Sequence, residues 1–448
     1  MKETDVVVIG GSAAGLTAAL TARRHYPEKR ILVVRREAQV LVPCGIPYIF
    51  GTLKSPEKNV MPDAPYEANN IELMKADVTE LDREKKVLQT SEGSIQYDRL
   101  IMATGSLPIM PPIPGFDIDG VFAIQKDIDY LQGLLDRLQS AKDVVIIGGG
   151  FIGIEFADEI KKMGNANVTI VEMMPHCLSL AYDDEFCIEM EEVLASRGIN
   201  IKTAAKVEKI AGKDKVEAVR LADGTDVKAD AVILGIGAVA NVDLAKKVGL
   251  RIGLTGGIAV DQTMLTSDPS IFAAGDCAEK ISFFGGRPTG LKLASIAQTE
   301  ARIAGANLFG IKRQNYGTVG VWSTCVGNFA LGTAGLTEAM ARQRGYDVVV
   351  AVVEGPNRHP GGMPGMAKTK MKAVFEANSG VILGGQVRGD TATGEMINAV
   401  SACVQKRMTV EDIATFQIGT HPALTASPVV YPLVNAAEVA ISKMRQQG

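Results

Sequence analysis

The chain has no pair of cysteines spaced for joint chemistry. No two cysteines form a CxxC motif, and the six stand apart at Cys44, Cys177, Cys187, Cys277, Cys325 and Cys403. This spacing indicates neither a zinc site nor a CxxC dithiol, and we expect no bound metal. Any thiol chemistry must therefore be that of a single cysteine.

The chain also lacks long apolar runs and an excess of either charge. No run reaches the length that spans a membrane, and the N-terminal residues lead straight into a strand without the apolar core of a signal peptide. The net charge is only −4 and is spread along the chain, which argues against nucleic acid or an anionic membrane as the main partner. These absences predict a cytoplasmic protein that binds neither.

What the chain does contain favours an α/β protein of several domains. At 448 residues it is too long for one hydrophobic core, and we expect about two to four domains. It is 46% hydrophobic and 22% charged, and its 47 glycines fit a fold with many tight turns.

The first nucleotide-binding signature lies near the N-terminus. Asp5–Ile9 is typical of a buried parallel strand, and it leads through the glycine turn Gly10–Gly15 into a predicted helix over Leu16–Arg24. The glycines let the backbone approach a pyrophosphate, whose charge the N–H groups at the helix start can bind. Ser12 replaces the middle glycine of GxGxxG, so this motif alone is imperfect.

A second strand, Arg30–Val34, should pair with the first. An acidic residue that holds the adenosine ribose usually follows such a strand, but this chain continues with Arg35, Arg36 and Glu37. Glu37 can serve if the register shifts slightly.

The same pattern returns in complete form near residue 150. Val144–Ile147 leads into Gly148–Glu155, a full GxGxxG between a strand and a helix. A further strand, Val168–Val171, ends at Glu172, about twenty residues beyond the glycines, where the ribose 2′-hydroxyl is expected. A carboxylate there repels a 2′-phosphate, and no arginine follows to accept one. The sequence therefore predicts NADH over NADPH.

Three further strands end in small residues. They lead to Ala103-Thr104-Gly105, to Gly237, and to Gly275 with Asp276. Asp276 is a carboxylate at the C-terminal edge of a strand, where ligands of α/β proteins bind, although a helix cap is an equal interpretation of it alone.

The remaining chain suggests domain boundaries. The prolines between Pro108 and Pro114 make a stiff connector. From about Tyr316 strands give way to helices, and the apolar stretch Pro428–Met444 needs a partner surface, so a third, α+β domain that dimerises is the simplest account.

Cys44 lies in a short apolar run punctuated by proline and glycine. Pro43 and Pro47 remove two backbone N–H donors and Gly45 permits unusual dihedral angles, so the sulfur should lie on a shaped turn. If a helix begins after Gly45 with Pro47 in its first turn, its positive end would stabilise a thiolate. The alternative is a buried cysteine that acts as a small hydrophobic side chain.

Taken in this order, the two glycine turns, Cys44, the Ala103–Gly105 turn and the Gly275-Asp276 segment resemble the flavoprotein pyridine nucleotide-disulfide oxidoreductases. The resemblance covers essentially the whole chain. It implies two Rossmann-like domains, an FAD domain over 1–113 and 245–320 and an inserted NAD domain over 114–244, followed by a C-terminal α+β dimerisation domain over 321–448. It also implies that the first glycine turn holds the FAD pyrophosphate and that Asp276 holds the ribityl chain.

The single cysteine divides that superfamily. Glutathione and lipoamide reductases carry a CxxxxC pair, but here the residue five after Cys44 is Ile49. Cys44–Tyr48 is similar to the Cys-Gly-apolar-Pro-Tyr segment of coenzyme A-disulfide and polysulfide reductases. The peroxidases and oxidases usually carry a histidine in the first glycine turn, where this chain has Ala13.

Two departures concern the C-terminal domain. The tyrosine-rich motif of coenzyme A-disulfide reductases is not visible between Gly384 and Val400. Instead, residues 419–426 resemble the segment in which a partner-chain histidine of the two-cysteine reductases acts as acid and base. The orienting glutamate is Ala426 here, so His421 is either the general acid from the other subunit or a surface histidine.

The resemblance also implies substrate contacts. Arg23 and Arg24 resemble residues that meet coenzyme A phosphates, although arginines at a helix end also compensate the dipole. Tyr48 and Tyr431 are further expected substrate contacts, and Tyr431 is also a second, weaker candidate acid.

These observations predict an FAD-dependent NADH:disulfide or polysulfide oxidoreductase that works as a homodimer. NADH reduces FAD, which reduces an oxidised Cys44, and the released thiolate attacks the next disulfide, persulfide or polysulfide; coenzyme A-linked compounds are among the expected substrates. The alternatives are an NADH oxidase and a reductase of an electron-transfer protein such as rubredoxin. The expected cofactor contacts are Gly10, Gly11, Ser12, Ala13, Ala14, Gly15, Arg35, Arg36, Glu37, Pro43, Cys44, Ala103, Thr104, Gly105, Gly148, Gly150, Phe151, Ile152, Gly153, Glu155, Glu172, Gly237, Gly275, Asp276 and Ala294.

Overall fold

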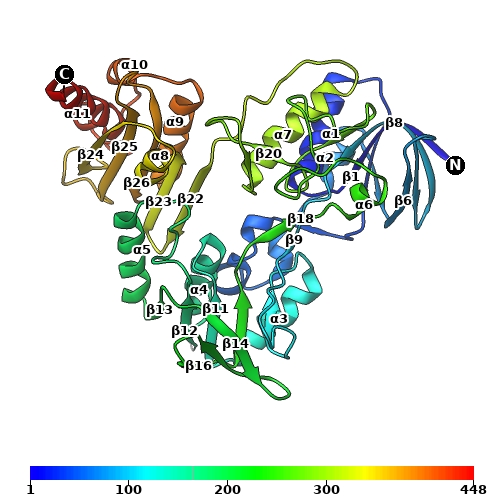
Figure 1. The fold of residues 1–448 in the computed structure, drawn as a ribbon, viewed down its shortest axis with the longest axis horizontal. Helices are drawn as coiled ribbons and strands as arrows, with labels where there is room; N and C mark the ends of the chain where they lie inside the picture. The colour runs from blue at the N-terminus through cyan, green and yellow to red at the C-terminus, as the bar shows by residue number, and fades with distance from the viewer. Residues whose placement is uncertain (165, 448) are drawn as a thin grey trace. The chain divides into compact units, whose positions relative to one another are not determined.

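The structure is a computed structural model that describes residues 1–164 and 166–447. The chain forms two compact units (Figure 1). Unit 1 contains Met1–Pro112, Phe122–Ser140 and Ile236–Thr318. Unit 2 contains Ile113–Val121, Ala141–Gly235 and the chain from Val319 onward.

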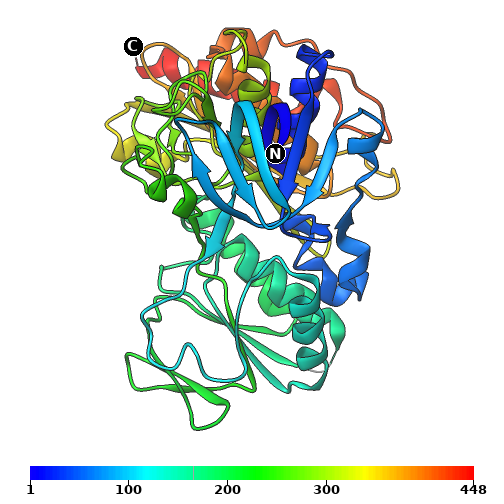
Figure 2. The same ribbon diagram turned by 90° about the vertical axis from the view of Figure 1, so that its right-hand side faces the viewer.

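Unit 1 is built on a mostly parallel sheet in the order β5-β2-β1-β8-β7-β6, with β19 paired to β8. Its strands β1, β2 and β8 are nearly continuous apolar runs, and Val6, Val7 and Val8 of the central strand are fully buried, as expected for a sheet covered on both faces. Figure 2 shows these strands side by side, with the N-terminus at the start of β1. The strands are β1 (Lys2–Ile9), β2 (Ile31–Arg35), β5 (Glu72–Lys75), β6 (Val78–Asp82), β7 (Val87–Thr90), β8 (Gly93–Met102) and β19 (Ile271–Ala273).

Two long helices of this unit, α1 (Ala13–His25) and α7 (Ala294–Asn307), pack against each other (Figure 1). Small residues of both helices are buried, which lets the two backbones approach closely. The other elements that lie wholly in unit 1 are β3 (Val40–Leu41), η1 (Pro43–Gly45), η2 (Ile49–Leu53), η3 (Pro56–Asn59), β4 (Val60–Met61), α2 (Ala64–Glu67), β9 (Ser106–Pro108), α3 (Ile128–Ser140), β18 (Ala238–Ala240), α6 (Asp243–Lys247), β20 (Lys280–Ile281) and β21 (Pro288–Thr289).

The first part of unit 2 repeats the parallel architecture. Strands β17, β11, β12 and β13 run parallel in that order, with Val144 beside both Val168 and Ala231. The elements are β11 (Asp143–Ile147), α4 (Phe151–Met163), β12 (Asn167–Val171), α5 (Asp184–Ser196), β13 (Ile199–Lys202) and β17 (Ala231–Leu234). A small antiparallel sheet consists of β14 (Val207–Gly212), β15 (Val216–Leu221) and β16 (Asp226–Lys228). The short strand β10 (Val121–Ala123) begins at Val121, the last residue of the first segment of unit 2.

The second part of unit 2 is an antiparallel sheet in the order β22-β23-β26-β25-β24. Helix α9 packs on β23 and β26, and α11 packs on β24 and β25 (Figure 1). The elements are β22 (Val321–Val326), β23 (Phe329–Gly335), α8 (Glu338–Gln343), β24 (Val348–Pro356), β25 (Lys368–Glu376), β26 (Ile382–Gly389), α9 (Thr393–Gln405), α10 (Val410–Ala414), η4 (Pro428–Val430) and α11 (Pro432–Gln447).

A buried charge cluster joins the two parts of unit 2. Lys372 on β25 is 6% exposed, and its Nζ lies 2.7–2.9 Å from carboxylate oxygens of Asp183, Glu185 and Glu338. Asp183 also accepts hydrogen bonds from the side chain of Gln386 and from the first N–H groups of α8. Burial opposes its charge, but these partners together lower the pKa of Asp183.

The predicted fold class is confirmed: two parallel sheets, each with a glycine turn, precede an α+β C-terminal part. The exact borders of the three predicted domains stay a prediction. Among the helices of the described residues, none combines the length and hydropathy needed to cross a membrane.

Candidate active site

The first glycine turn, between β1 and α1, is packed so closely that two of its positions accept only glycine. Gly10 has a φ of +108°, and a Cβ there would lie 2.2 Å from the carbonyl oxygen of Ala103. A Cβ on Gly15 would lie 1.8 Å from the carbonyl oxygen of Gly10. Only glycine fits at either position, and the turn presents the N-terminal end of a 13-residue helix. These features fit a site for the pyrophosphate of FAD.

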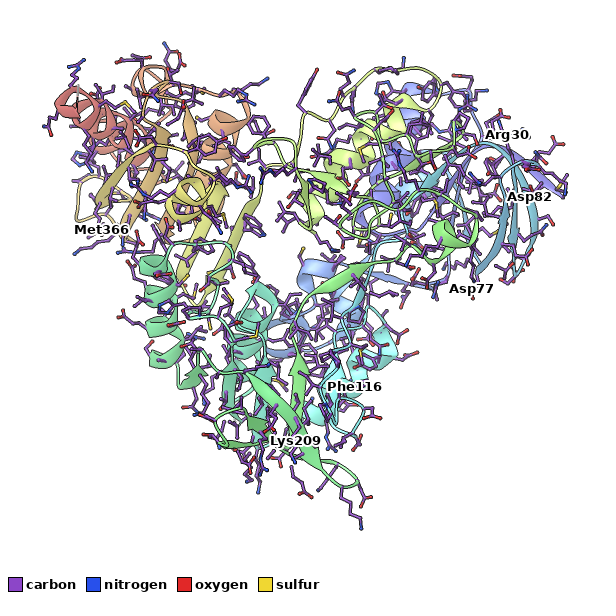
Figure 3. All side chains as sticks on the ribbon, viewed as in Figure 1. Arg30, Asp77, Asp82, Phe116, Lys209 and Met366 are labelled. Carbon is purple, nitrogen blue, oxygen red and sulfur yellow. The ribbon has the colours of Figure 1, made fainter. Side chains whose placement is uncertain are left out.

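Arg35, at the end of β2, is engaged in holding the next loop. It is 3% exposed and donates to both carboxylate oxygens of Asp63, at 2.6 and 2.8 Å, and to two backbone carbonyls. Arg36 is exposed and pairs with Asp77, which Figure 3 labels. Glu37 is exposed. The proposed contact of these residues with the adenosine ribose stays a prediction, and Arg35 can contribute to it mainly by shaping the loop.

Three of the predicted segments converge behind this turn. Ala103 follows β8 and touches Gly10, while pairing of β19 with β8 brings the Gly275 segment alongside. Asp276 accepts a hydrogen bond from Ser106 Oγ at 2.8 Å. Thr104 Oγ1 donates to the carbonyl of Asn241 at 2.7 Å. Gly237 accepts a hydrogen bond from the backbone N–H of Ile109, and Ala294 is the first residue of α7.

Cys44 is exposed on a tight turn, so the alternative of a buried hydrophobic cysteine is wrong. It lies within the 3₁₀ turn η1, between Pro43 and Gly45. The suggested helix with Pro47 in its first turn forms only in part: Ile46 and Tyr48 have α-helical dihedral angles, and a five-residue π-helical turn, η2, follows over Ile49–Leu53. Short turns of this kind carry no useful dipole, so a helix terminus does not account for a thiolate here.

Asn59, a buried residue that sequence reasoning missed, supports the Cys44 turn. Asn59 donates its side-chain N–H to the carbonyl of Val42 at 3.0 Å and accepts the Val42 N–H at its own carbonyl. A Cβ on Gly45 would lie 2.0 Å from Asn59 Oδ1. A larger residue after the cysteine would therefore have to displace the Asn59 side chain that holds the turn.

The second glycine turn, between β11 and α4, fits a dinucleotide. Gly148 has a φ of +108°, and a Cβ on Gly153 would lie 1.9 Å from the Gly148 carbonyl oxygen. Gly150 is the N-cap of α4. Glu172 accepts hydrogen bonds from the N–H groups of Gly149 and Met174, both at 2.6 Å. A carboxylate is thus fixed beside the turn, where the predicted ribose contact requires it.

Two residues of β22 reach helix α4 of this site. Trp322, the chain's one tryptophan, stacks on Phe151 with ring centroids 6.2 Å apart and planes 7° apart. Thr324 Oγ1 donates to Glu155 at 2.9 Å. Burial raises the pKa of Glu155 to about 7, with Glu159 adding to the rise and Thr324 opposing it. Sequence reasoning missed both partners because no local pattern links residues so far apart.

His421 has a backbone partner in place of the missing glutamate. Its Nδ1 accepts the N–H of Ala423 at 3.2 Å, which favours the tautomer with the proton on Nε2. Thr425 also anchors the loop by accepting the His421 N–H at Oγ1. His421 is exposed, and Tyr431 is half-buried with its pKa raised by burial.

The predicted substrate contacts fall into different environments. Arg23 donates to four backbone carbonyls, of Pro27, Lys29, Asn69 and Asn70, and so ties α1 to the following loops. Arg24 is exposed and Tyr48 is partly exposed. Of the two arginines, Arg24 is the one that can meet a phosphate without giving up backbone contacts.

Two glycine turns that fit dinucleotides, together with one exposed cysteine, are the features of a nucleotide-dependent redox enzyme. Residues 4–301 match the family described as pyridine nucleotide-disulphide oxidoreductase, and residues 321–430 match the dimerisation domain of that family. The chain belongs to this family, whose members use FAD and NAD(P)H.

The relatives carry several names. The chain is 32% identical to an NADH oxidase of Methanocaldococcus jannaschii, over 98% of this chain and 99% of that protein. It is 33% identical to an NAD(P)H coenzyme A polysulfide/persulfide reductase of Pyrococcus horikoshii, over 97% and 98%. Among solved structures, an NAD-dependent persulfide reductase from A. fulgidus matches with a TM-score of 0.90 and 31% identity, over 99% of this chain and 84% of that one.

Proposed function

We propose that this protein is an FAD-dependent, NADH-linked reductase of small sulfur compounds that works through Cys44. One observation carries the proposal: a single cysteine stands exposed on a tight turn, held by Asn59, of a chain that has two glycine turns fit for dinucleotides. The names of the P. horikoshii and A. fulgidus relatives support a persulfide or polysulfide as the substrate. A disulfide, and a link to coenzyme A, belong to the same proposal.

The chemistry needs only one cysteine. When bound, FAD and NADH supply two electrons and a proton. The Cys44 thiolate attacks the outer sulfur of a persulfide RSSH, which forms Cys44–SSH and releases RS⁻. A proton from His421 of the partner subunit neutralises RS⁻. Two electrons and one proton then cleave Cys44–SSH to the thiolate and H₂S, so that RSSH, NADH and H⁺ give RSH, H₂S and NAD⁺.

We further propose that NADH is preferred to NADPH. Glu172 is held by two backbone N–H groups, so its carboxylate cannot swing away from a 2′-phosphate without losing both hydrogen bonds. Replacing Glu172 with glutamine should reduce the preference for NADH over NADPH, measured as the ratio of kcat/KM for the two cofactors.

The proposal is tested by anaerobic NADH oxidation on the FAD-loaded enzyme. Polysulfide, coenzyme A disulfide and glutathione disulfide are offered in parallel, and we expect rapid turnover with one of the first two. Cys44→Ser should retain its FAD absorbance and lose sulfur reduction, because serine cannot form a persulfide. Cys403→Ser, at a buried cysteine of unit 2, is the matched control and should keep its activity. Unchanged turnover in Cys44→Ser contradicts the scheme.

An NADH oxidase is the second candidate, and the name of the M. jannaschii relative favours it. In that case admitting air should restore NADH consumption when no sulfur compound turns over, and the oxygen consumed should match the NADH. Ala13, which stands where oxidases usually have a histidine, argues for the sulfur substrates.

A further inference from the structure

A buried ion pair lies behind the turn that carries Asp276. Lys280, which begins β20, is 3% exposed, and Glu300 on α7 is 1% exposed; Nζ and Oε2 are 3.1 Å apart. Burying two charges is costly, and apolar residues of similar volume often stabilise a fold equally well. The geometry of the pair therefore calls for a reason beyond stability.

The hydrogen bonds of this pair converge on one residue, Gly275, and reach the peptide groups on both sides of its Cα. Glu300 Oε2 accepts the N–H of Gly275 at 2.9 Å, and Lys280 Nζ donates to the Gly275 carbonyl at 2.5 Å. A further bond from Lys280 to the carbonyl of Ala278, at 2.9 Å, closes the turn on its other side. Among the described residues no partner reaches Glu300 Oε1. Every hydrogen bond that the pair makes to the backbone therefore goes to this turn.

The same turn rests against the first glycine turn. Gly275 has a φ of +84°, and a Cβ there would lie 2.9 Å from the Cβ of Ala14 at the start of α1. On its open side the next residue, Asp276, accepts a hydrogen bond from Ser106. Holding the peptide groups on both sides of Gly275 therefore fixes Asp276 relative to the helix end that fits the FAD pyrophosphate.

We propose that Lys280 and Glu300 are positioning residues of the flavin site: from the buried side they hold the two peptide groups that flank Gly275, and thereby set how firmly Asp276 holds FAD. The inference rests on the proposed assignment of Asp276 and the first glycine turn to FAD. Neither side chain needs to touch the cofactor, because both act through the backbone of the residue before Asp276.

The test is the rate at which diluted holoenzyme releases FAD, followed by the fluorescence of free flavin. In Lys280→Met/Glu300→Leu the pair is replaced by apolar side chains of similar volume, so the fold should survive. Loss of the hydrogen bonds to the Gly275 N–H and carbonyl should speed the release of FAD by about tenfold or more. Lys372→Met is the matched control, a buried lysine of unit 2, and should melt at a lower temperature without releasing FAD faster.

A conservative variant separates positioning from charge. Glu300→Gln keeps an oxygen acceptor for the Gly275 N–H, so its release rate should stay within about threefold of wild type. Release in Lys280→Met/Glu300→Leu at the wild-type rate overturns the proposal. If that variant does not fold, Lys280→Met replaces it, and equal release from Lys280→Met, Glu300→Gln and wild type overturns the proposal as well.

Asp276→Ala distinguishes this inference from the cofactor assignment on which it rests. If wild type retains FAD and Asp276→Ala releases it at the same rate, the assignment of Asp276 fails, and the positioning role fails with it. If Asp276→Ala releases FAD quickly while the double variant does not, only the positioning role fails.

Discussion

At the scale of single residues, buried carboxyl groups near the two nucleotide turns stand out. Burial raises the pKa of Glu155 and of Glu300 to about 7, although each has a hydrogen-bond partner. For Glu155 the loss of hydration outweighs the hydrogen bond from Thr324, so this carboxyl group holds a proton at pH values where an exposed glutamate releases it.

This shift predicts how Glu155 links stability to pH. Because its pKa is higher in the folded than in the unfolded chain, the folded state binds more protons between about pH 4.5 and 7. The stabilisation that results is complete below about pH 4.5 and is lost as the pH rises through about 7. Glu155→Gln should therefore melt with a flatter pH dependence and be more stable than wild type at about pH 8. Melting temperatures of both proteins across this range check the prediction; identical curves contradict it.

At the scale of elements, each glycine turn is specified by backbone collisions that any Cβ would cause. Gly153 is the clearest position, because its Cβ would lie 1.9 Å from a carbonyl oxygen of its own turn. With any larger residue at this position, the N-terminal end of α4 would have to move. The N–H groups that are proposed to bind the NADH pyrophosphate would move with it.

We therefore expect Gly153→Ala to raise the KM for NADH by about tenfold or more while the enzyme keeps its FAD. Gly133→Ala is the matched control: Gly133 lies within helix α3 with open space around its Cβ position, so alanine there should be neutral or slightly stabilising. Steady-state kinetics and FAD absorbance measure both effects. Loss of FAD from Gly153→Ala would mean that the two turns are not independent.

Much of both glycine turns could be predicted from the sequence, because strand, turn and helix follow one another within about thirty residues. Side-chain contacts between segments that are distant in the sequence could not be predicted. Trp322 stacks on Phe151 and Asn59 supports the Cys44 turn only because the sheets bring these segments together. The helix expected after Gly45 forms only in part, because the chain takes a 3₁₀ turn at Pro43–Gly45 and a π-helical turn from Ile49.

At the scale of the whole molecule, Lys372 joins a parallel and an antiparallel sheet into one unit. Lys372→Met leaves buried Asp183 without its cation, and we expect unfolding to become easier by about 3–5 kcal/mol. Urea denaturation followed by circular dichroism measures the change. A Lys406→Met control, at an exposed lysine after α9, should leave the free energy of unfolding unchanged.

The proposed homodimer makes a further prediction at this scale. If His421 of the partner subunit supplies the proton, Cys44→Ser and His421→Ala subunits complement each other in mixed dimers. Random mixing gives half mixed dimers with one intact site of two, so about a quarter of wild-type activity should return. Activity that stays at the level of the two parent variants contradicts a shared site.

The stacking of Trp322 on Phe151 also gives the chain an optical label of its own. Because this is the chain's one tryptophan and it lies against the first residue of α4, its emission reports on the second glycine turn without any added dye. A nicotinamide cofactor that settles on the second glycine turn should quench that emission, and the quenching curve can be recorded in enzyme that does not turn over.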